Sequence, residues 1–447
     1  MADAILHFPP DFKWGTATSS HQVEGDNTNN QWYVWERTPG NIVDGDTSGQ
    51  ACDWWRNAEA DFDRMVELGL NAHRLSLEWS RIEPREGWFD DAAIDRYRQM
   101  LLGLRQRGIE PMVTLHHFTN PIWLEEQCGW EEADTVVPKF ERYAAKVVQS
   151  MGDLCDLWCT VNEPSIYAIM GYLTDDGHMP PGRPGHLGTT LRVVRNMLLG
   201  HGAAYAALHE RQPLARVGIA HHMREFQPLR SGHPLDGAAA RLHDTLFNQS
   251  LLDTVVRGRW GPFLGRGARH GARRLRRTID WIGLNYYTRQ RSRFDRHHSA
   301  LFFTNIGDSP GAVMSDFNYG EIYPEGLTHC LRRLSRLRLP VYITENGLPD
   351  ADDDLRPSYI VRHLRALWGA IQWNWQIQGY YHWSFVDNFE WGQGFRMKFG
   401  LYELNRQTQA RTPRPSALLY RDIAKANALS SDIVRHHTPD LLPVLFP

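Results

Sequence analysis

The chain has 447 residues, of which 42% are hydrophobic and 23% are charged, and its net charge at pH 7 is −3. This composition is typical of a globular protein with a large core, and the small net charge excludes a general attraction to nucleic acid or to acidic membranes. No apolar run approaches the ~18 residues that cross a bilayer, so no membrane span is expected.

Eight strand-like segments recur along the chain, and helical patterns separate most of them. Each is a short run rich in β-branched and aromatic residues, which is typical of buried strands. The segments are Phe12–Ser20, Asn71–Trp79, Ile109–His117, Leu157–Glu163, Ala215–Met223, Trp281–Thr288, Val341–Glu345 and Gly379–Phe385.

Three of the intervening helices are clear from their apolar stripes. Asp90 is a suitable N-cap for the second of them, and Gly69, Gly108 and Gly152 end the three in turn. The stripes are Phe62, Met65 and Val66; Ile94, Tyr97, Leu101 and Leu104; and Val136, Phe140, Tyr143, Val147 and Met151.

Strands that alternate with helices predict a parallel sheet in an α/β protein. Eight such units in one undivided chain favour a single (β/α)8 TIM barrel, and we expect residues 1–447 to form one catalytic domain. The alternative is an open doubly wound sheet, which normally carries a glycine-rich turn after its first strand. Ser19-Ser20-His21-Gln22 follows that strand here, which disfavours the open sheet.

Polar residues gather at the carboxyl ends of the predicted strands. In a barrel these ends surround one mouth, where the active sites of such proteins lie. A random composition at the strand ends would be expected if the positions had no shared role. The residues are Gln22, Arg74, His117, Asn162, Glu163, Asn285, Tyr287, Glu345 and Glu390.

Glu163 and Glu345 are the most informative members of this set. Pro164 and Asn346-Gly347 end the two apolar runs directly after them. Two carboxyls at one mouth are the minimum equipment for cleaving a glycosidic bond: about 5–5.5 Å apart for retention of configuration and about 6.5–9.5 Å apart for inversion. The alternative is that both are structural carboxylates paired with arginine.

Seven motifs are together similar to the signatures of glycoside hydrolase family 1, of the β-glucosidase type. The resemblance extends from about residue 12 to about residue 423. The matching segments are Trp14–Ser20, Gln22–Gly25, Arg74–Ile82, Thr160–Pro164, Gly283–Thr288, Ile343–Gly347 and Trp383–Trp391.

The resemblance implies a role for each residue of the catalytic group. Glu163 would be the general acid/base, and Glu345 the nucleophile that forms a covalent glycosyl-enzyme with retention. Arg74 and Tyr287 would contact the nucleophile, and Asn285 belongs to the same group. We expect the charge of Glu345 to raise the pKa of Glu163 and to keep it protonated.

The resemblance also implies a pocket that holds the terminal sugar, which would be a β-D-glucosyl and also a β-D-galactosyl or β-D-fucosyl residue. The substrate would be a small β-glycoside or a short oligosaccharide such as cellobiose, and no cofactor is expected. The implied sugar-binding residues are Gln22, His117, Asn162, Trp383, Glu390, Trp391 and Phe399.

Two segments depart from the family pattern. Phe118-Thr119 stands where relatives commonly have Trp-Asp, and Tyr319-Gly320 where many carry a tryptophan on the leaving-group side. The first change puts one sugar contact in question, and the second puts the aglycone preference in question.

Three alternative functions remain on the same fold. A transglycosylase would share the first half-reaction, so the sequence does not separate it from a hydrolase. A 6-phospho-β-glycosidase is disfavoured because the carboxylate of Glu390 would repel a phosphate. A non-catalytic sugar-binding barrel is disfavoured because both candidate carboxyls are present.

Other clusters point to no further partner. Adjacent strand residues face opposite ways, so the pairs His116-His117, His221-His222 and His297-His298 are poor metal chelates. The arginines between 266 and 277 favour a solvated helix face over an anion contact, and the acidic run 350–354 favours a helix start near Pro357 over a calcium loop.

Two counts bear on location and packing. Five cysteines and the lack of a secretory signal predict a cytoplasmic protein, and the sequence indicates no oligomeric state. The 17 tryptophans fit core packing and ligand stacking about equally well.

Overall fold

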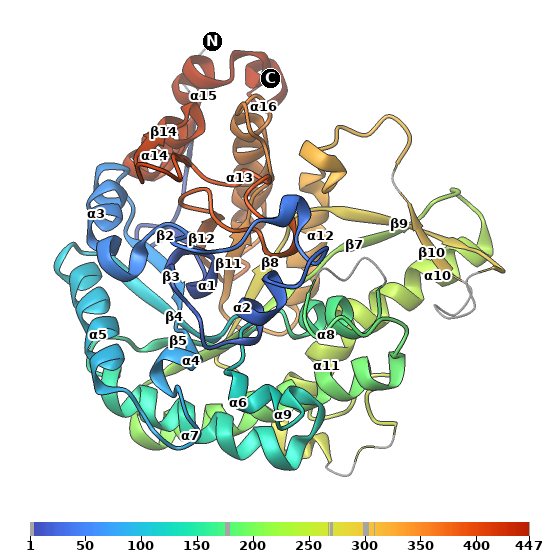
Figure 1. Ribbon diagram of the computed structural model, residues 1–447. Coiled ribbons are helices and arrows are strands. Elements are labelled where there is room, and N and C mark those ends of the chain that lie inside the picture. The colour runs from blue at the N-terminus through green and yellow to red at the C-terminus, as the bar shows by residue number, and fades with distance from the viewer. Residues whose placement is uncertain are drawn as a thin grey trace.

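Eight parallel strands close into a barrel in this computed structural model, which describes residues 4–174, 179–266, 268, 271–297, 304–307 and 309–446. Figure 1 shows the barrel with its helices around it. The strands follow chain order around the barrel and coincide with the eight predicted segments, so the predicted (β/α)8 fold is confirmed. They are β2 (Lys13–Ala17), β3 (Ala72–Ser76), β4 (Glu110–His116), β5 (Leu157–Asn162), β6 (Arg216–His222), β8 (Trp281–Asn285), β11 (Val341–Asn346) and β12 (Ile377–Trp383).

The barrel strands are buried on both faces because side chains fill the interior while helices cover the outside. The interior cluster combines small residues with large ones, including Ala17, Ala72, Met112, Leu157, Trp281 and Tyr381. A second, larger cluster lies between the strands and the helices. This two-sided burial explains why the strands appear as short apolar runs without alternation.

The three predicted stripes belong to α3 (Trp54–Glu67), α5 (Asp91–Gln106) and α7 (Ala133–Met151). Asp90 caps α5 as predicted, since its carboxylate accepts from the backbone N–H groups of Ala92 and Ala93. Val66 was wrongly assigned to the buried stripe of α3. Its side chain is exposed because it lies on the solvent side of a helix that buries Phe62 and Met65.

The remaining long helices alternate with the strands or pack at the ends of the chain. These helices are α8 (Pro164–Tyr172), α9 (Leu187–Arg211), α11 (Ser250–Arg257), α12 (Pro324–Ser335), α13 (Arg356–Gln372) and α14 (Pro415–Ala426). In addition, α10 (Pro234–Asp244) packs against β7 and β9, and α15 (Ser431–His437) packs against α14 near the end of the chain. Shorter ones are α1 (Ser20–Val23), α2 (Gln31–Glu36), α4 (Trp79–Ile82), α6 (Ile122–Glu125) and α16 (Leu442–Leu445). Among the described helices, none combines the length and the apolar character needed to cross a membrane.

Among the described residues, seven short strands outside the barrel were not predicted. β7 (Glu225–Pro228), β9 (Arg289–Phe294) and β10 (Thr304–Gly307) form a sheet that projects from the barrel at the right of Figure 1. β1 (Ile5–His7) pairs with β15 (Ala428–Ser430), and β13 (Tyr402–Leu404) pairs with β14 (Arg411–Pro413). These strands have three to six residues each, and β9 and β14 are also largely polar, so the seven carry little of the apolar signal used to find the barrel.

The predictions for the acidic run 350–354 and for the arginines between 266 and 277 fared differently. The acidic run precedes α13 as predicted, and one carboxylate oxygen of Asp350 accepts from the N–H groups of Leu355 and Arg356. The long helix face predicted for the arginine run is not seen in the part of the run that the structure describes, where Ala272–Leu275 form a four-residue 3-10 helix. Exposed arginines instead line an open surface groove of about 970 Å³; these are Arg257, Arg259, Arg273, Arg276 and Arg277. Arg269 and His298 lie outside the described residues.

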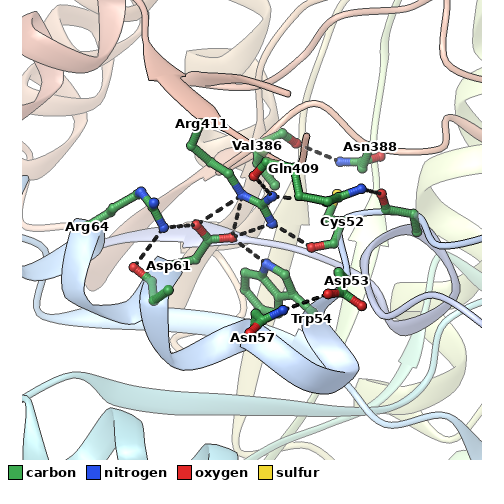
Figure 2. A network of polar contacts seen from close by, with 12 residues as sticks. Cys52, Asp53, Trp54, Asn57, Asp61, Arg64, Val386, Asn388, Gln409 and Arg411 are labelled. Carbon is green, nitrogen blue, oxygen red and sulfur yellow. Dashed lines mark hydrogen bonds and ion pairs between the residues drawn. The ribbon is translucent and has the colours of Figure 1, made fainter. Parts of the chain in front are cut away.

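A buried polar network joins the C-terminal hairpin to the first barrel helix (Figure 2). Arg411 on β14 donates to the carboxylate of Asp61 on α3 over 3.1–3.3 Å. Trp54 and Arg64 also donate to Asp61, over 2.7 and 2.9 Å. The side chains of Arg411 and Asp61 are only 5% and 1% exposed, so this ion pair is shielded from water.

Replacing Arg411 with alanine is expected to destabilise the protein by about 3–5 kcal/mol, because the charge of Asp61 stays buried without its main partner. The midpoint of thermal unfolding, followed by circular dichroism, should fall by several degrees. Arg98→Ala is the matched control: it breaks an arginine–aspartate pair with Asp153 that is largely exposed, and it should barely move the midpoint. Equal shifts for the two variants would contradict this account.

Candidate active site

A cavity of about 350 Å³ opens at the carboxyl ends of the barrel strands. Both Glu163 and Glu345 line it, one directly after β5 and the other near the end of β11. The predicted meeting of these two residues at one mouth is therefore seen in the structure.

The backbone at Glu163 is held in an unusual conformation. Its φ of 45° and ψ of 57° are left-handed, which few residues other than glycine adopt. Its N–H donates to the carbonyl of Ala220 on β6 over 2.8 Å, and Pro164 begins α8 immediately after it. The pairing of β5 with β6 also shifts register just before this point. Such irregularities re-aim side chains and are common beside active sites.

The backbone at Glu345 is fixed by its neighbours on both sides. The pairing of β11 with β8 shifts register between Ile343 and Glu345, and the pairing with β12 shifts there too. A Cβ at Gly347 would lie 1.9 Å from the carbonyl oxygen of Trp383, so only glycine fits at this position. The sequence Glu-Asn-Gly therefore reflects close packing against β12 as well as a turn.

Glu345 is bound by one cation and one hydroxyl. Arg74 Nη1 lies 2.5 Å from Oε1, and the hydroxyl of Tyr287 donates to Oε2 over 2.6 Å. Arg74 is itself buried and also donates to Thr114 and Asn162. Burial nevertheless raises the pKa of Glu345 to about 7, against the attraction of Arg74 and with a contribution from the charge of Glu163.

Glu163 has different partners. His222 Nδ1 lies 2.9 Å from its Oε1, and the amide of Asn285 donates to the same oxygen over 2.7 Å. Burial favours the neutral form of Glu163, but the contacts with His222 and Asn285 outweigh it and lower the pKa of this carboxyl. The structure gives the opposite order to the one expected from sequence, with the higher pKa on Glu345. The largest cause of the lowering is the attraction of a charged His222, a residue that the sequence did not connect with Glu163, so the lowering applies where that imidazole is charged.

Asparagine side chains link the two carboxyls. Asn285 accepts from Thr344 over 2.6 Å, which orients its amide toward Glu163 and toward Asn162. Asn162 in turn accepts from Arg74 over 2.7 Å, and its amide nitrogen lies 3.1 Å from His117 Nε2. A displacement of one carboxyl would therefore disturb the partners of the other.

Several of the candidate sugar-binding side chains line the cavity and contact one another. The ring of His117 stacks between those of Trp383 and Trp391, at 5.8 and 6.0 Å. Gln22 donates to Glu390 over 3.1 Å. Burial raises the pKa of Glu390 to about 8, with a further contribution from the negative charge of Glu345.

The predicted residues divide into those that line the cavity and those that support it. Glu163, Glu345, Tyr287, His117, Trp383, Glu390 and Trp391 line it. In the described part of the chain, the other five lie behind this wall and are buried; they are Gln22, Arg74, Asn162, Asn285 and Phe399. The ring of Phe399 packs edge-on against that of Tyr319 at 5.3 Å, and Tyr319 lines the cavity.

Several residues that line the cavity were not among the site residues predicted from sequence. His222 is the last residue of β6 and Arg224 follows it closely, and Ile166, Met170 and Met179 add apolar side chains to the lining. Only the pair His221-His222 gave a sequence signal, and it was considered only as a metal chelate. The two departures also line the cavity, since Phe118 and Tyr319 both contact it.

Comparisons with known proteins agree with this geometry. The sequence profile of "Glycosyl hydrolase family 1" matches residues 5–429. A β-galactosidase of Sulfolobus acidocaldarius is 30% identical over 98% of this chain and 100% of its own. The solved β-glycosidase from Pyrococcus horikoshii has a TM-score of 0.89 and 35% identity, covering 97% of this chain and 98% of that one. The β-glucosidase from Thermotoga maritima in complex with glucoimidazole has a TM-score of 0.89 and 30% identity, covering 95% and 100%.

Proposed function

Because this chain belongs to glycosyl hydrolase family 1, we propose that it is a retaining β-glucosidase that releases the terminal sugar of small β-glycosides. A glucosyl group is the expected glycone, and a galactosyl or fucosyl group is the expected second choice. Relatives named β-glucosidase and β-galactosidase support both sugars.

This proposal rests on the different hydrogen-bond partners of Glu345 and Glu163, whose carboxyls share one cavity. Glu345 contacts a permanent cation and a hydroxyl, and both favour its ionised form against the neutral form that burial favours, which suits a carboxylate that attacks. Glu163 contacts an imidazole and an amide, which hold its position and leave its second oxygen to carry a proton. A nucleophile and an acid/base need this difference.

The reaction would proceed in two displacements. In the first, a carboxylate oxygen of Glu345 forms a bond to the anomeric carbon while the bond to the leaving oxygen breaks. Glu163 gives its proton to that oxygen, so the aglycone leaves as an alcohol. In the second, Glu163 takes a proton from water, which attacks the anomeric carbon and releases Glu345. Two inversions give net retention.

Polar atoms around the cavity suit the hydroxyls of a sugar. Among the described residues, Nδ1 of His117 is buried and has no protein partner, so a sugar hydroxyl can pair with it. Glu390 can accept from two hydroxyls when it is ionised, and Trp383 offers a flat apolar face. We propose that these three residues hold the glycone, with Gln22 and Asn162 fixing their positions.

A panel of aryl β-glycosides that vary in the sugar tests this function. We expect cleavage of the glucoside, and weaker cleavage of the galactoside and fucoside. Proton NMR during the first minutes should show the β-anomer of the free sugar before mutarotation. Appearance of the α-anomer, or cleavage of none of the glycosides, would overturn the proposal. Transfer of the sugar to an added alcohol would measure the share of transglycosylation.

The high pKa of Glu390 predicts a pH-dependent preference against 6-phosphorylated sugars. A group with a pKa of about 8 is neutral at pH 7 and ionised above pH 8, so the repulsion inferred from sequence is weak at neutral pH. The ratio of kcat/KM for an aryl β-glucoside to that for its 6-phosphate should therefore rise by about tenfold or more from pH 7 to pH 9.

Ionisation of the catalytic carboxyls changes the rates for both substrates equally, so its effect cancels in this ratio. The phosphate itself contributes little to the change, because it is already largely a dianion at pH 7. Glu390→Gln should flatten the rise, because glutamine does not ionise. A ratio that stays constant in the unchanged protein would show that Glu390 does not face the 6-position.

Two wider proposals accompany the function. We propose that residues 1–447 act as one catalytic domain, since barrel strands occur from β2 to β12 without a separate unit between them among the described residues. All five cysteines are free thiols, which supports a reducing, cytoplasmic location.

A further inference from the structure

His222 lies at the end of β6 and is buried beside the candidate acid/base. Its exposed fraction is 4%, and its Nδ1 lies 2.9 Å from Oε1 of Glu163. Its ring stacks on Tyr287 at 5.6 Å, with an angle of 27° between the rings, and Phe247 packs edge-on against it. The imidazole is therefore held in one orientation, with one nitrogen toward Glu163.

Arg224 determines which nitrogen of His222 carries the hydrogen. Its Nε donates to Nε2 of His222 over 3.0 Å. Nε2 must then be the acceptor, with a free lone pair, because a guanidinium has no lone pair to offer. The neutral tautomer that satisfies this contact carries its hydrogen on Nδ1 and donates it to Glu163. An imidazolium would place two N–H groups face to face and is disfavoured by this geometry.

The two charges closest to His222 act in opposite directions on its pKa, and Arg224 is the one that favours the neutral imidazole. Glu163 faces it from the end of β5, Arg224 follows it in the chain, His221 precedes it, and Tyr287 covers its ring. Burial lowers the pKa of His222, the attraction of Glu163 opposes this, and the positive charge of Arg224 adds to the lowering. Without Arg224, the remaining close charge would be the carboxylate of Glu163, which favours the imidazolium.

The protonation of His222 matters because it decides the state of Glu163. An imidazolium beside Glu163 would form an ion pair, and the carboxyl would then be ionised and unable to act as an acid. A neutral imidazole donates one hydrogen bond without a charge, and Asn285 donates a second to the same oxygen. The other oxygen, Oε2, is then the one that carries the catalytic proton.

We propose that Arg224 and His222 form a positioning pair. Arg224 keeps His222 a neutral Nδ1–H donor, so that the proton which His222 and Glu163 could share stays on Glu163. This inference rests on the proposed function, since it assigns a task to the acid/base of a glycosidase. Neither residue touches the sugar in this account. Their effect should be confined to substrates that need a proton on the leaving group.

Arg224→Gln tests this with two glucosides of different leaving groups. For phenyl β-glucoside, whose leaving group needs a proton, kcat/KM should fall by at least about tenfold. For 2,4-dinitrophenyl β-glucoside, which leaves without one, the fall should stay below about threefold. Cleavage of the second substrate also shows that the variant is folded. Arg291→Gln is the matched control, because Arg291 lies on β9 and bonds to Ser309 away from the cavity.

The same change in a His222→Asn background separates this mechanism from a general loss of structure. Asparagine does not take up a proton, so Arg224→Gln should then have less than about a twofold effect on either substrate. An equal loss in both backgrounds, or an equal loss on both substrates, would overturn the inference. If the unchanged protein cleaves neither glucoside, it is the proposed function that fails.

The unchanged protein offers a direct measurement. Nitrogen-15 NMR at pH 6, with the His222→Asn variant used for assignment, should show His222 as the neutral Nδ1–H tautomer. An imidazolium signal, or the opposite tautomer, would contradict the role given to Arg224.

Discussion

Replacing Glu345 with glycine is expected to stop hydrolysis of every β-glycoside, with kcat falling by at least about 10⁴-fold. The covalent intermediate needs an oxygen nucleophile at this position, and no other described carboxyl in the cavity has the same contacts with Arg74 and Tyr287. The measurement is the rate of release of dinitrophenol from its β-glucoside, an activated substrate for which acid assistance is unimportant.

The Glu345→Gly variant also leaves space that a small anion can fill. Azide or formate should bind beside Arg74 and attack the anomeric carbon from the side of the missing carboxylate. The product with azide should be the α-glucosyl azide, which NMR distinguishes from the β-anomer. Glu345→Gln is the matched control: it should be equally inactive, but azide should not rescue it because the amide still fills the space. Full activity in either variant would remove Glu345 from the mechanism.

The barrel and its mouth could be predicted from the sequence because both depend on local patterns. Strands buried on both faces form short apolar runs, and their carboxyl ends must meet once the barrel closes. Glu163 and Glu345 end two such runs, so their meeting required no knowledge of side-chain contacts. The sheet of β7, β9 and β10 lacks this signal, since β9 consists of Arg289–Phe294 and is largely polar.

The partners of Glu163 could not be predicted in the same way. His222 meets it beside a shift in the register between β5 and β6, a detail that strand alternation does not reveal. Adjacent histidines suggested opposite faces, and this is what occurs: His221 bonds to the carbonyl of Asn248, whereas His222 faces the cavity. Strand alternation correctly placed His221 and His222 on opposite faces, where they make a poor metal chelate. It did not indicate which residues each ring contacts.

The error in the pKa order has the same origin. From sequence, the charge of Glu345 was the one known influence on Glu163, and it acts to raise the pKa. The structure adds an imidazole and an amide on one oxygen, which act in the opposite direction. The outcome therefore depends on whether that imidazole is charged, and the charge depends on Arg224, which no motif identified.

Replacing Glu163 with alanine is expected to have an effect that depends on the leaving group. For phenyl β-glucoside, kcat/KM should fall by about 10³-fold, because the leaving oxygen departs without a proton. For 2,4-dinitrophenyl β-glucoside, the first displacement should be slowed far less. The second displacement should be slowed with every substrate, because the base that activates water is also lost.

These two effects make the glycosyl-enzyme accumulate, so dinitrophenol should appear as a burst followed by a slow steady rate. Mass spectrometry of the quenched protein should find one glucosyl group on the peptide that contains Glu345. Azide should restore the steady rate and give the β-glucosyl azide, the anomer opposite to that expected with Glu345→Gly. The opposite anomers distinguish the two carboxyls by role, since azide attacks free substrate in one variant and the glycosyl-enzyme in the other. The same anomer from both variants would mean that the roles assigned to Glu163 and Glu345 are wrong.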